Sequence, residues 1–318
     1  MTALDSVRTV AVVGAGAIGA SWTALALEHG LTVVVTDPDP AAGDRLRGLV
    51  AAFLDGTDPD DPDGTDPASY ADRLSVTDDA TAAAAAADLV LEAGPERLEV
   101  KRAIVAELDA AARPDVLIAS SSSGLTPTSF QSAAARHPER VLVVHPFNPP
   151  HLVPLVEVVG GAQTSETAIA TAMELFRDLG KHPIRLRREL PGHVANRLQA
   201  ALWREAYHLV EQGVVSVADL DTAISSGPGL RWALLGPMAT QHLSGGGLGL
   251  RHVLQHLGPA QVEWWADLGS PELTPELIET LARGVEAELG DDDEAALLAR
   301  RDAALRELLR TKERLGLE

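Results

Sequence analysis

Two residues of the chain have the chemistry for moving a proton, and both lie in apolar segments. His145 ends the apolar run 141–145 and precedes a proline-rich stretch, whereas Glu157 lies in the middle of the apolar run 155–159. A carboxylate inside a buried strand is costly unless it is paired, and His145 is the obvious partner. The glutamate would then fix the imidazole tautomer and raise its basicity, leaving the other ring nitrogen free to accept a proton. We expect His145 to be a general base oriented by Glu157, although the spacing alone fits a structural histidine equally well.

Hydroxyl and amide side chains form a second candidate set. Residues 120–124 read Ser-Ser-Ser-Ser-Gly directly after an apolar run, where hydroxyl groups could hold a ligand oxygen. A plain serine-rich turn explains the same residues. Asn196 lies early in a predicted helix, where its propensity is poor. Because it breaks a local rule near a predicted domain boundary, it indicates a functional position.

A glycine-rich turn points to a nucleotide. The sequence predicts, in order, a strand, a glycine turn, a helix, a second strand and a terminal acid, at residues 10–13, 14–19, 21–29, 31–35 and 37. Gly14 permits the tight turn, Gly16 lets a pyrophosphate approach the backbone, and Gly19 lets the helix pack against the strand. This complete order is typical of a dinucleotide-binding unit.

The residues around this turn also predict which dinucleotide binds. Ala17 and Ile18, inside the glycine turn, are expected to bind the cofactor, and the N-terminus of the helix that follows offers N–H donors and partial positive charge to phosphates. Asp37 would accept hydrogen bonds from both ribose hydroxyls and repel a 2′-phosphate. We therefore expect NAD rather than NADP as the cofactor.

The elements that position these residues alternate between strand and helix up to about residue 187. Further strands are predicted at residues 88–93, 116–120, 141–145, 155–159 and 182–186, with helices at 96–112 and 165–179. Such alternation is typical of a doubly wound, mostly parallel Rossmann-type α/β sheet. Residues 55–67 are rich in Asp, Pro, Gly and Thr and read as an exposed loop.

The pattern becomes helical after residue 187. Helices are predicted at residues 191–212, 219–224, 230–235, 238–243 and 250–257, followed by a helical tail at 274–317 with an acidic break at 290–294. Thr274 before Pro275 is a suitable N-cap for that tail. We expect two domains, an NAD-binding domain at residues 1–187 and an all-α substrate and dimerisation domain at 188–318.

Composition excludes several function classes. The 318 residues carry a net charge of −20, which argues against nucleic acid and anionic membranes as partners. The chain has no cysteine, which excludes disulfides and thiolate metal sites. His252 and His256 have helical spacing but lack the glutamate of a zinc motif, so no metal is expected. The cytoplasm is the expected compartment, and the apolar helices of the second domain predict a homodimer.

In combination, these motifs resemble the 3-hydroxyacyl-CoA dehydrogenase family over nearly the whole chain. The resemblance rests on the glycine turn, Glu92-Ala-Gly-Pro-Glu96 with Lys101, the serine run, His145-Pro-Phe-Asn-Pro and Leu155-Val-Glu157-Val. It implies that His145 is the base, that Glu157 orients it and that Asn196 helps to hold the substrate. It also implies that a serine binds substrate and ribose, at Ser123 or at Ser122. Glu96 and Lys101 match the acid and the lysine that the family places near the nicotinamide ribose.

Within that family, three stretches resemble the branch of L-carnitine and L-gulonate 3-dehydrogenases. They are residues 124–127, 145–150 and 227–233, and residues 251–259 favour the carnitine side. The expected function is oxidation of the 3-hydroxyl of a small hydroxy acid with NAD. Arg231 would bind the substrate carboxylate, and the eight aspartates in residues 41–73 would repel coenzyme A. Alternatives are a true 3-hydroxyacyl-CoA dehydrogenase, a ketoreductase of a polyketide acid, and a crystallin-like protein that binds NAD without catalysis.

Overall fold

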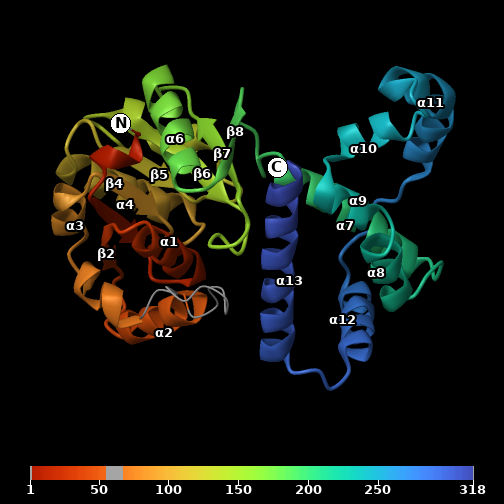
Figure 1. The fold of residues 1–318 in the computed structure, drawn as a ribbon, viewed down its shortest axis with the longest axis horizontal. Helices are drawn as coiled ribbons and strands as arrows, with labels where there is room; N and C mark the ends of the chain where they lie inside the picture. Colours follow the sequence, from red (N-terminus) through yellow and green to blue (C-terminus); the bar gives the residue numbers. More distant parts are fainter. Residues whose placement is uncertain (1, 55–66, 318) are drawn as a thin grey trace. The chain divides into compact units, whose positions relative to one another are not determined.

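The computed structural model of the chain describes residues 2–54 and 67–317. They fall into two compact units, Met1–Asn196 and Arg197–Glu318 (Figure 1). The loop expected at residues 55–67 lies outside the described residues except for Pro67. None of the helices in the described ranges combines the length and the hydropathy that crossing a membrane requires.

The first unit is built on one sheet, which has eight strands within the described residues, in the order β3-β2-β1-β4-β5-β6-β7-β8. The strands are β1 Thr9–Val13, β2 Thr32–Thr36, β3 Leu74–Thr77, β4 Leu89–Glu92, β5 Leu117–Ser120, β6 Val141–Pro146, β7 Leu155–Gly160 and β8 His182–Leu186. All neighbouring strands run parallel except β6 and β7, which are antiparallel. The predicted Rossmann-type sheet is thus confirmed, and β3 is the strand that the apolar runs did not predict.

Helices cover both faces of this sheet (Figure 1). They are α1 Ala17–Glu28, α2 Ala42–Leu54, α3 Ala80–Ala86, α4 Leu98–Ala111, α5 Pro127–Gln131 and α6 Glu166–Asp178, with short 3₁₀ turns at Leu4–Ser6, Pro67–Arg73 and Pro138–Arg140. Successive strand residues point to opposite faces. In β1, Val10 and Val12 pack with α1, α2 and α6, whereas Ala11 and Val13 pack with α3, α4 and α5. Strands buried on both faces explain why they read as continuous apolar runs.

The second unit is helical, as the sequence predicts. Its helices are α7 Ala195–Glu211, whose first two residues belong to the first unit, α8 Val217–Ser225, α9 Pro228–Leu234, α10 Pro237–Leu243, α11 Gly249–Asp267, α12 Pro275–Leu289 and α13 Glu294–Leu315. The short helix predicted at residues 250–257 is wrong in extent, because α11 continues through Pro259. Thr274 does cap α12, accepting a hydrogen bond from the Leu277 N–H, and Gly290 ends that helix.

The start of α7 differs from the prediction. The sequence predicts a helix from Pro191, but α7 begins at Ala195 because Gly192 and His193 have φ angles of 73° and 49°. These values lie in the left-handed region, which a right-handed helix cannot contain. The turn leaves the first N–H groups of α7 without partners inside the helix. These N–H groups can therefore donate hydrogen bonds to a side chain of the sheet.

Candidate active site

His145 and Glu157 lie opposite each other across the antiparallel pair β6 and β7. His145 Nδ1 is 2.8 Å from Glu157 Oε2, and both side chains are buried. A carboxylate can only accept, so Nδ1 carries the proton and donates it. The Nε2 atom of His145 has no hydrogen-bond partner in the described parts of the chain. The histidine is therefore oriented by one nitrogen and able to accept a proton on the other.

Glu157 is held as a carboxylate by three donors. Its Oε1 atom accepts hydrogen bonds from the backbone N–H groups of Val194, at 2.8 Å, and Ala195, at 3.0 Å. Burial acts to raise the pKa of Glu157, but the hydrogen bonds from His145, Ala195 and Val194 outweigh it and hold the pKa below its usual range. These N–H groups come from the start of α7, where unpaired donors favour negative charge. The glutamate thus stays ionised beside the histidine.

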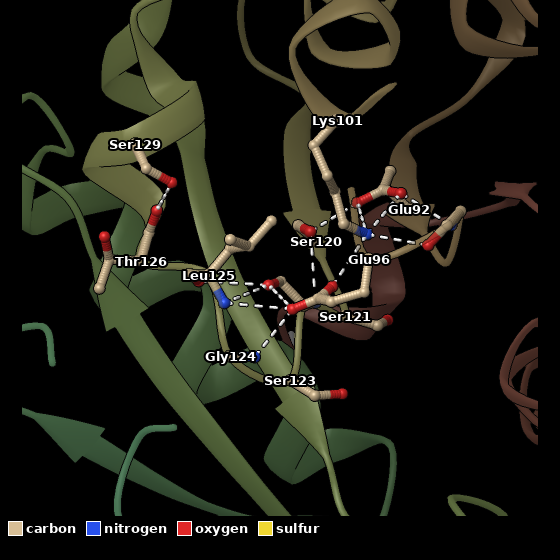
Figure 2. Close-up of polar contacts among 12 residues, drawn as sticks. Glu92, Glu96, Lys101, Ser120, Ser121, Ser123, Gly124, Leu125, Thr126 and Ser129 are labelled. Carbon is tan, nitrogen blue, oxygen red and sulfur yellow. Dashed lines mark hydrogen bonds and ion pairs between the residues drawn. The ribbon is translucent and has the colours of Figure 1, made fainter. Parts of the chain in front are cut away.

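The serine loop, residues 120–125, follows β5 at the same edge of the sheet. Glu96 binds it from one side: Glu96 Oε1 accepts from Ser122 Oγ at 2.7 Å, Gly124 N at 2.8 Å and Leu125 N at 3.1 Å (Figure 2). Partial burial acts to raise the pKa of Glu96, but these bonds and the Lys101 ammonium lower it overall. Glu96 is therefore an anion that fixes the shape of the loop.

Lys101 forms a buried ion pair with Glu92, a residue to which the sequence analysis gave no role. The Lys101 ammonium lies 2.9 and 2.8 Å from the two Glu92 oxygens and 3.0 Å from the Gly94 carbonyl (Figure 2). Their side chains are 1% and 0% exposed. Glu92 also accepts hydrogen bonds from Ser120 Oγ and Gly94 N. Since all three ammonium protons are used inside the protein, Lys101 ties α4 to the end of β4, and Glu92 extends this link to the end of β5 through Ser120.

The two alternative serines have different surroundings. Ser122 is buried, and its hydroxyl is bonded to Glu96. Ser123 is exposed, and its side chain points away from the Glu96 network (Figure 2). Asn196 Nδ2 donates to the Ser123 carbonyl oxygen at 3.0 Å. Of the two hydroxyl groups, that of Ser123 is thus the one free to meet a ligand.

The glycine turn has the space that a dinucleotide requires. Gly14 has a φ of 105°, and a side chain there would meet the Ala93 carbonyl at 2.6 Å, whereas a side chain on Gly16 would meet nothing within 4 Å. The Asp37 carboxylate accepts a hydrogen bond from Ala15 N at 2.9 Å, so it is held beside the turn. A cavity of about 370 Å³ opens here, lined by Gly14, Asp37, Pro38 and Pro95 among others. These residues fit the adenosine half of a dinucleotide.

Comparison with protein families agrees with this geometry. Residues 9–190 match the family model described as 3-hydroxyacyl-CoA dehydrogenase, NAD binding domain, and residues 192–288 match that described as 3-hydroxyacyl-CoA dehydrogenase, C-terminal domain. The chain belongs to the 3-hydroxyacyl-CoA dehydrogenase family. As a member it is an NAD-dependent oxidoreductase that acts on CH–OH groups.

Individual relatives match over their full length. The chain is 47% identical to an L-carnitine dehydrogenase of Streptomyces coelicolor, over 100% of this chain and 99% of the relative. It is 43% identical to a 3-hydroxyacyl-CoA dehydrogenase of Gibberella moniliformis, over 98% and 97%. Among solved structures, an NAD⁺-dependent 5-formyl-3-hydroxy-2-methylpyridine 4-carboxylic acid 5-dehydrogenase is 31% identical, with a TM-score of 0.80 over 96% of this chain and 99% of that one.

Two residues of this region were missed by the sequence analysis. Glu92 could have been found, because it lies inside the apolar run 88–93 just as Glu157 lies inside its own run. His193 is fully buried, and its ring centroid lies 5.2 Å from that of His145. It gave no such signal, because a histidine within a predicted helix has no special spacing.

Proposed function

We propose that this member of the family oxidises the 3-hydroxyl group of a small carnitine-like hydroxy acid with NAD, and that His145 is the general base. The observation that carries the proposal is the hydrogen bond between His145 Nδ1 and Glu157 Oε2, which leaves Nε2 free. The same arrangement explains why a charged residue occupies the buried strand β7.

In the proposed reaction His145 Nε2 takes the proton of the substrate hydroxyl. NAD, bound at the glycine turn, supplies the hydride acceptor for the carbon that bears this hydroxyl. Glu157 stabilises the resulting imidazolium, because it faces Nδ1 as an anion. We assign Ser123 and Asn196 to binding of the substrate oxygen, and Glu96 with the serine loop to the nicotinamide ribose. Lys101 supports that ribose site through its bonds to Glu92 and Gly94.

Two observations support a free acid as the substrate. The full-length relative at 47% identity is named for L-carnitine. Residues 41–73 contain eight aspartates against three arginines, which would repel the phosphates of coenzyme A. One observation favours a second candidate, a 3-hydroxyacyl-CoA substrate, because the fungal relative at 43% identity carries that name.

A substrate panel separates the two candidates. Purified enzyme with NAD is offered L-carnitine, L-gulonate and 3-hydroxybutyryl-CoA, and NADH formation is followed by absorbance. We expect the highest kcat/KM with L-carnitine, a lower value with L-gulonate and little turnover of the thioester. Efficient oxidation of 3-hydroxybutyryl-CoA with no activity on either free acid would replace the proposal by the second candidate.

Arg231 is the residue we propose for the substrate carboxylate. It lines a cavity of about 230 Å³ in the second unit, together with apolar residues and with Thr240 and Ser244. Its guanidinium forms no ion pair with another described residue. Because a lysine cannot reproduce the bidentate fork, Arg231→Lys should raise KM by about an order of magnitude with little change in kcat. An unchanged KM, with exposed Arg251→Lys as the matched control, would remove Arg231 from the site.

Asp37 is expected to decide between NAD and NADP. Because a carboxylate repels the 2′-phosphate, kcat/KM with NADP should be roughly 100-fold lower than with NAD. Asp37→Asn keeps an oxygen that can accept the hydrogen bond from the Ala15 N–H but removes the charge. It should therefore reduce the difference in kcat/KM between NAD and NADP. Asp37→Ala combined with Pro38→Arg should narrow it further. Equal turnover of both cofactors by the wild-type enzyme would contradict this prediction.

We also propose a homodimer built from the second unit, with the cytoplasm as its compartment. In the described residues of this unit few side chains are buried, and α13 has none. Trp264 and Trp265 on α11 are 62% and 66% exposed, and such apolar surface marks an interface. Light scattering should give twice the chain mass at micromolar concentration. Trp264→Glu should shift the mass toward the monomer, whereas Gln255→Glu on the same helix should not. A monomeric wild type would refute the dimer.

A further inference from the structure

His193 is a buried histidine beside the proposed base. It is 0% exposed, its ring lies 5.2 Å from that of His145, and its φ of 49° is the one positive value among the described non-glycine residues. A left-handed backbone at such a residue is strained and persists only where the surroundings enforce it. Filling space alone therefore does not explain why a histidine occupies position 193.

The hydrogen bonds of His193 fix its protonation state. Its Nε2 atom lies 3.0 Å from the Ser122 carbonyl oxygen, which can only accept, so Nε2 carries the proton. Its Nδ1 atom is buried with no hydrogen-bond partner in the described structure. Burial lowers the pKa of His193, and the neighbouring His145 adds to this effect against the Ser122 carbonyl and the carboxylates of Glu157 and Glu96. The ring is thus neutral, with a proton on Nε2 alone.

The bond to Ser122 is one of four made by consecutive residues, 193–196. His193 and Asn196 bind the carbonyl oxygens of Ser122 and Ser123, whereas the N–H groups of Val194 and Ala195 bind Glu157. This segment therefore joins the serine loop to the pair of His145 and Glu157. Glu96 holds the same loop from its other side.

We propose that His193 is a positioning residue of the active site: its Nε2–H holds the Ser122 carbonyl and so keeps the serine loop in register with His145. The proposal rests on the proposed function, since it assumes that the loop and His145 act on one substrate. An apolar ring would fill the same space without burying a nitrogen that lacks a hydrogen-bond partner, as His193 Nδ1 does in the described structure. What histidine adds is the hydrogen bond to the loop, and small displacements of catalytic groups cost large factors in rate.

Two variants separate positioning from packing. His193→Phe keeps a buried ring but has no donor, whereas His193→Gln can extend an amide N–H toward the Ser122 carbonyl. We expect His193→Phe to lower kcat roughly tenfold, the effect of one lost hydrogen bond. His193→Gln should recover most of that loss, and His182→Phe, at an exposed histidine on β8, should have no effect. A packing role predicts instead that His193→Phe keeps full kcat, and that result would overturn the proposal.

A measurement on the unmodified enzyme covers the case in which the variants do not fold. Long-range ¹H–¹⁵N correlation spectra of histidine-labelled protein at pH 7, assigned through the backbone, report the tautomer of each ring. We expect a neutral His193 protonated on Nε2 and a His145 protonated on Nδ1. A His193 protonated on Nδ1 would exclude the bond to Ser122 and with it the proposal. This readout needs no substrate, so it stands even if every hydroxy acid in the panel fails, a result that would sink the proposed function instead.

Discussion

Replacing His145 with glutamine should lower kcat by roughly 10²–10⁴-fold, the usual contribution of a general base. Glutamine keeps a polar side chain of similar reach but cannot take up a proton. The cofactor is expected to bind as before, because the glycine turn and Asp37 lie at a different part of the sheet edge. Turnover is measured by NADH absorbance with the best substrate of the panel, and NADH affinity by fluorescence titration.

Glu157→Gln and the double variant complete this experiment. The two groups act as one unit, so the double variant should be hardly slower than His145→Gln alone. A matched control lies on the surface of the same unit, where His137 Nδ1 is 3.0 Å from Glu139 Oε1. His137→Gln should leave kcat unchanged. A near-normal rate for His145→Gln, or fully additive losses, would refute the assignment of the base.

The second large effect concerns stability. Glu92→Gln would remove the buried counter-charge that contacts the Lys101 ammonium and leave only the Glu96 carboxylate at 3.8 Å, which is expected to cost about 3–5 kcal/mol of the free energy of unfolding. In a unit of this size that corresponds to a fall in Tm of roughly 10 °C. Urea unfolding followed by circular dichroism gives the free energy, and calorimetry gives Tm.

Two further variants test the cause of that loss. Adding Lys101→Met to Glu92→Gln removes the unpaired charge, so the double variant should recover much of the stability. Asp39→Asn breaks the exposed pair between Asp39 and Arg45, whose side chains are 46% and 60% exposed, and should cost less than about 1 kcal/mol. If Glu92→Gln unfolds at the same urea concentration as the wild type, the buried pair does not contribute the expected free energy of unfolding.

Most strands of the fold were predictable because they are buried on both faces, which produces a continuous apolar run in the sequence. The two edge strands are less buried, and one of them, β3 at Leu74–Thr77, was not predicted. The start of α7 was not predictable from local rules. His193 occupies a left-handed conformation that only its tertiary surroundings impose, so the sequence suggested helix four residues too early.

The charged residues of the candidate site were predictable from the sequence, but their partners were not. Charges inside apolar runs are rare enough to notice, and this rule identified Glu157 and applies equally to Glu92. Their partners depend on the arrangement of strands: Glu157 faces His145 across β6 and β7, whereas Lys101 reaches Glu92 from the neighbouring helix α4. A single sequence contains neither distance. The backbone donors at Val194 and Ala195 carry no sequence signal at all, because any residue supplies an N–H.

The antiparallel pairing of β6 and β7 fixes the spacing of His145 and Glu157 but leaves the segment that connects the two strands free to vary. The register places Val143 opposite Val159, Val144 opposite Val158 and His145 opposite Glu157. A slip by one residue would turn Glu157 to the face of the sheet opposite to His145, so the pair requires this alignment. The connecting residues 147–154 carry no part of that alignment. The length and composition of this segment can therefore differ among relatives and change the surface next to His145. The distance between His145 and Glu157 across the two strands would stay the same.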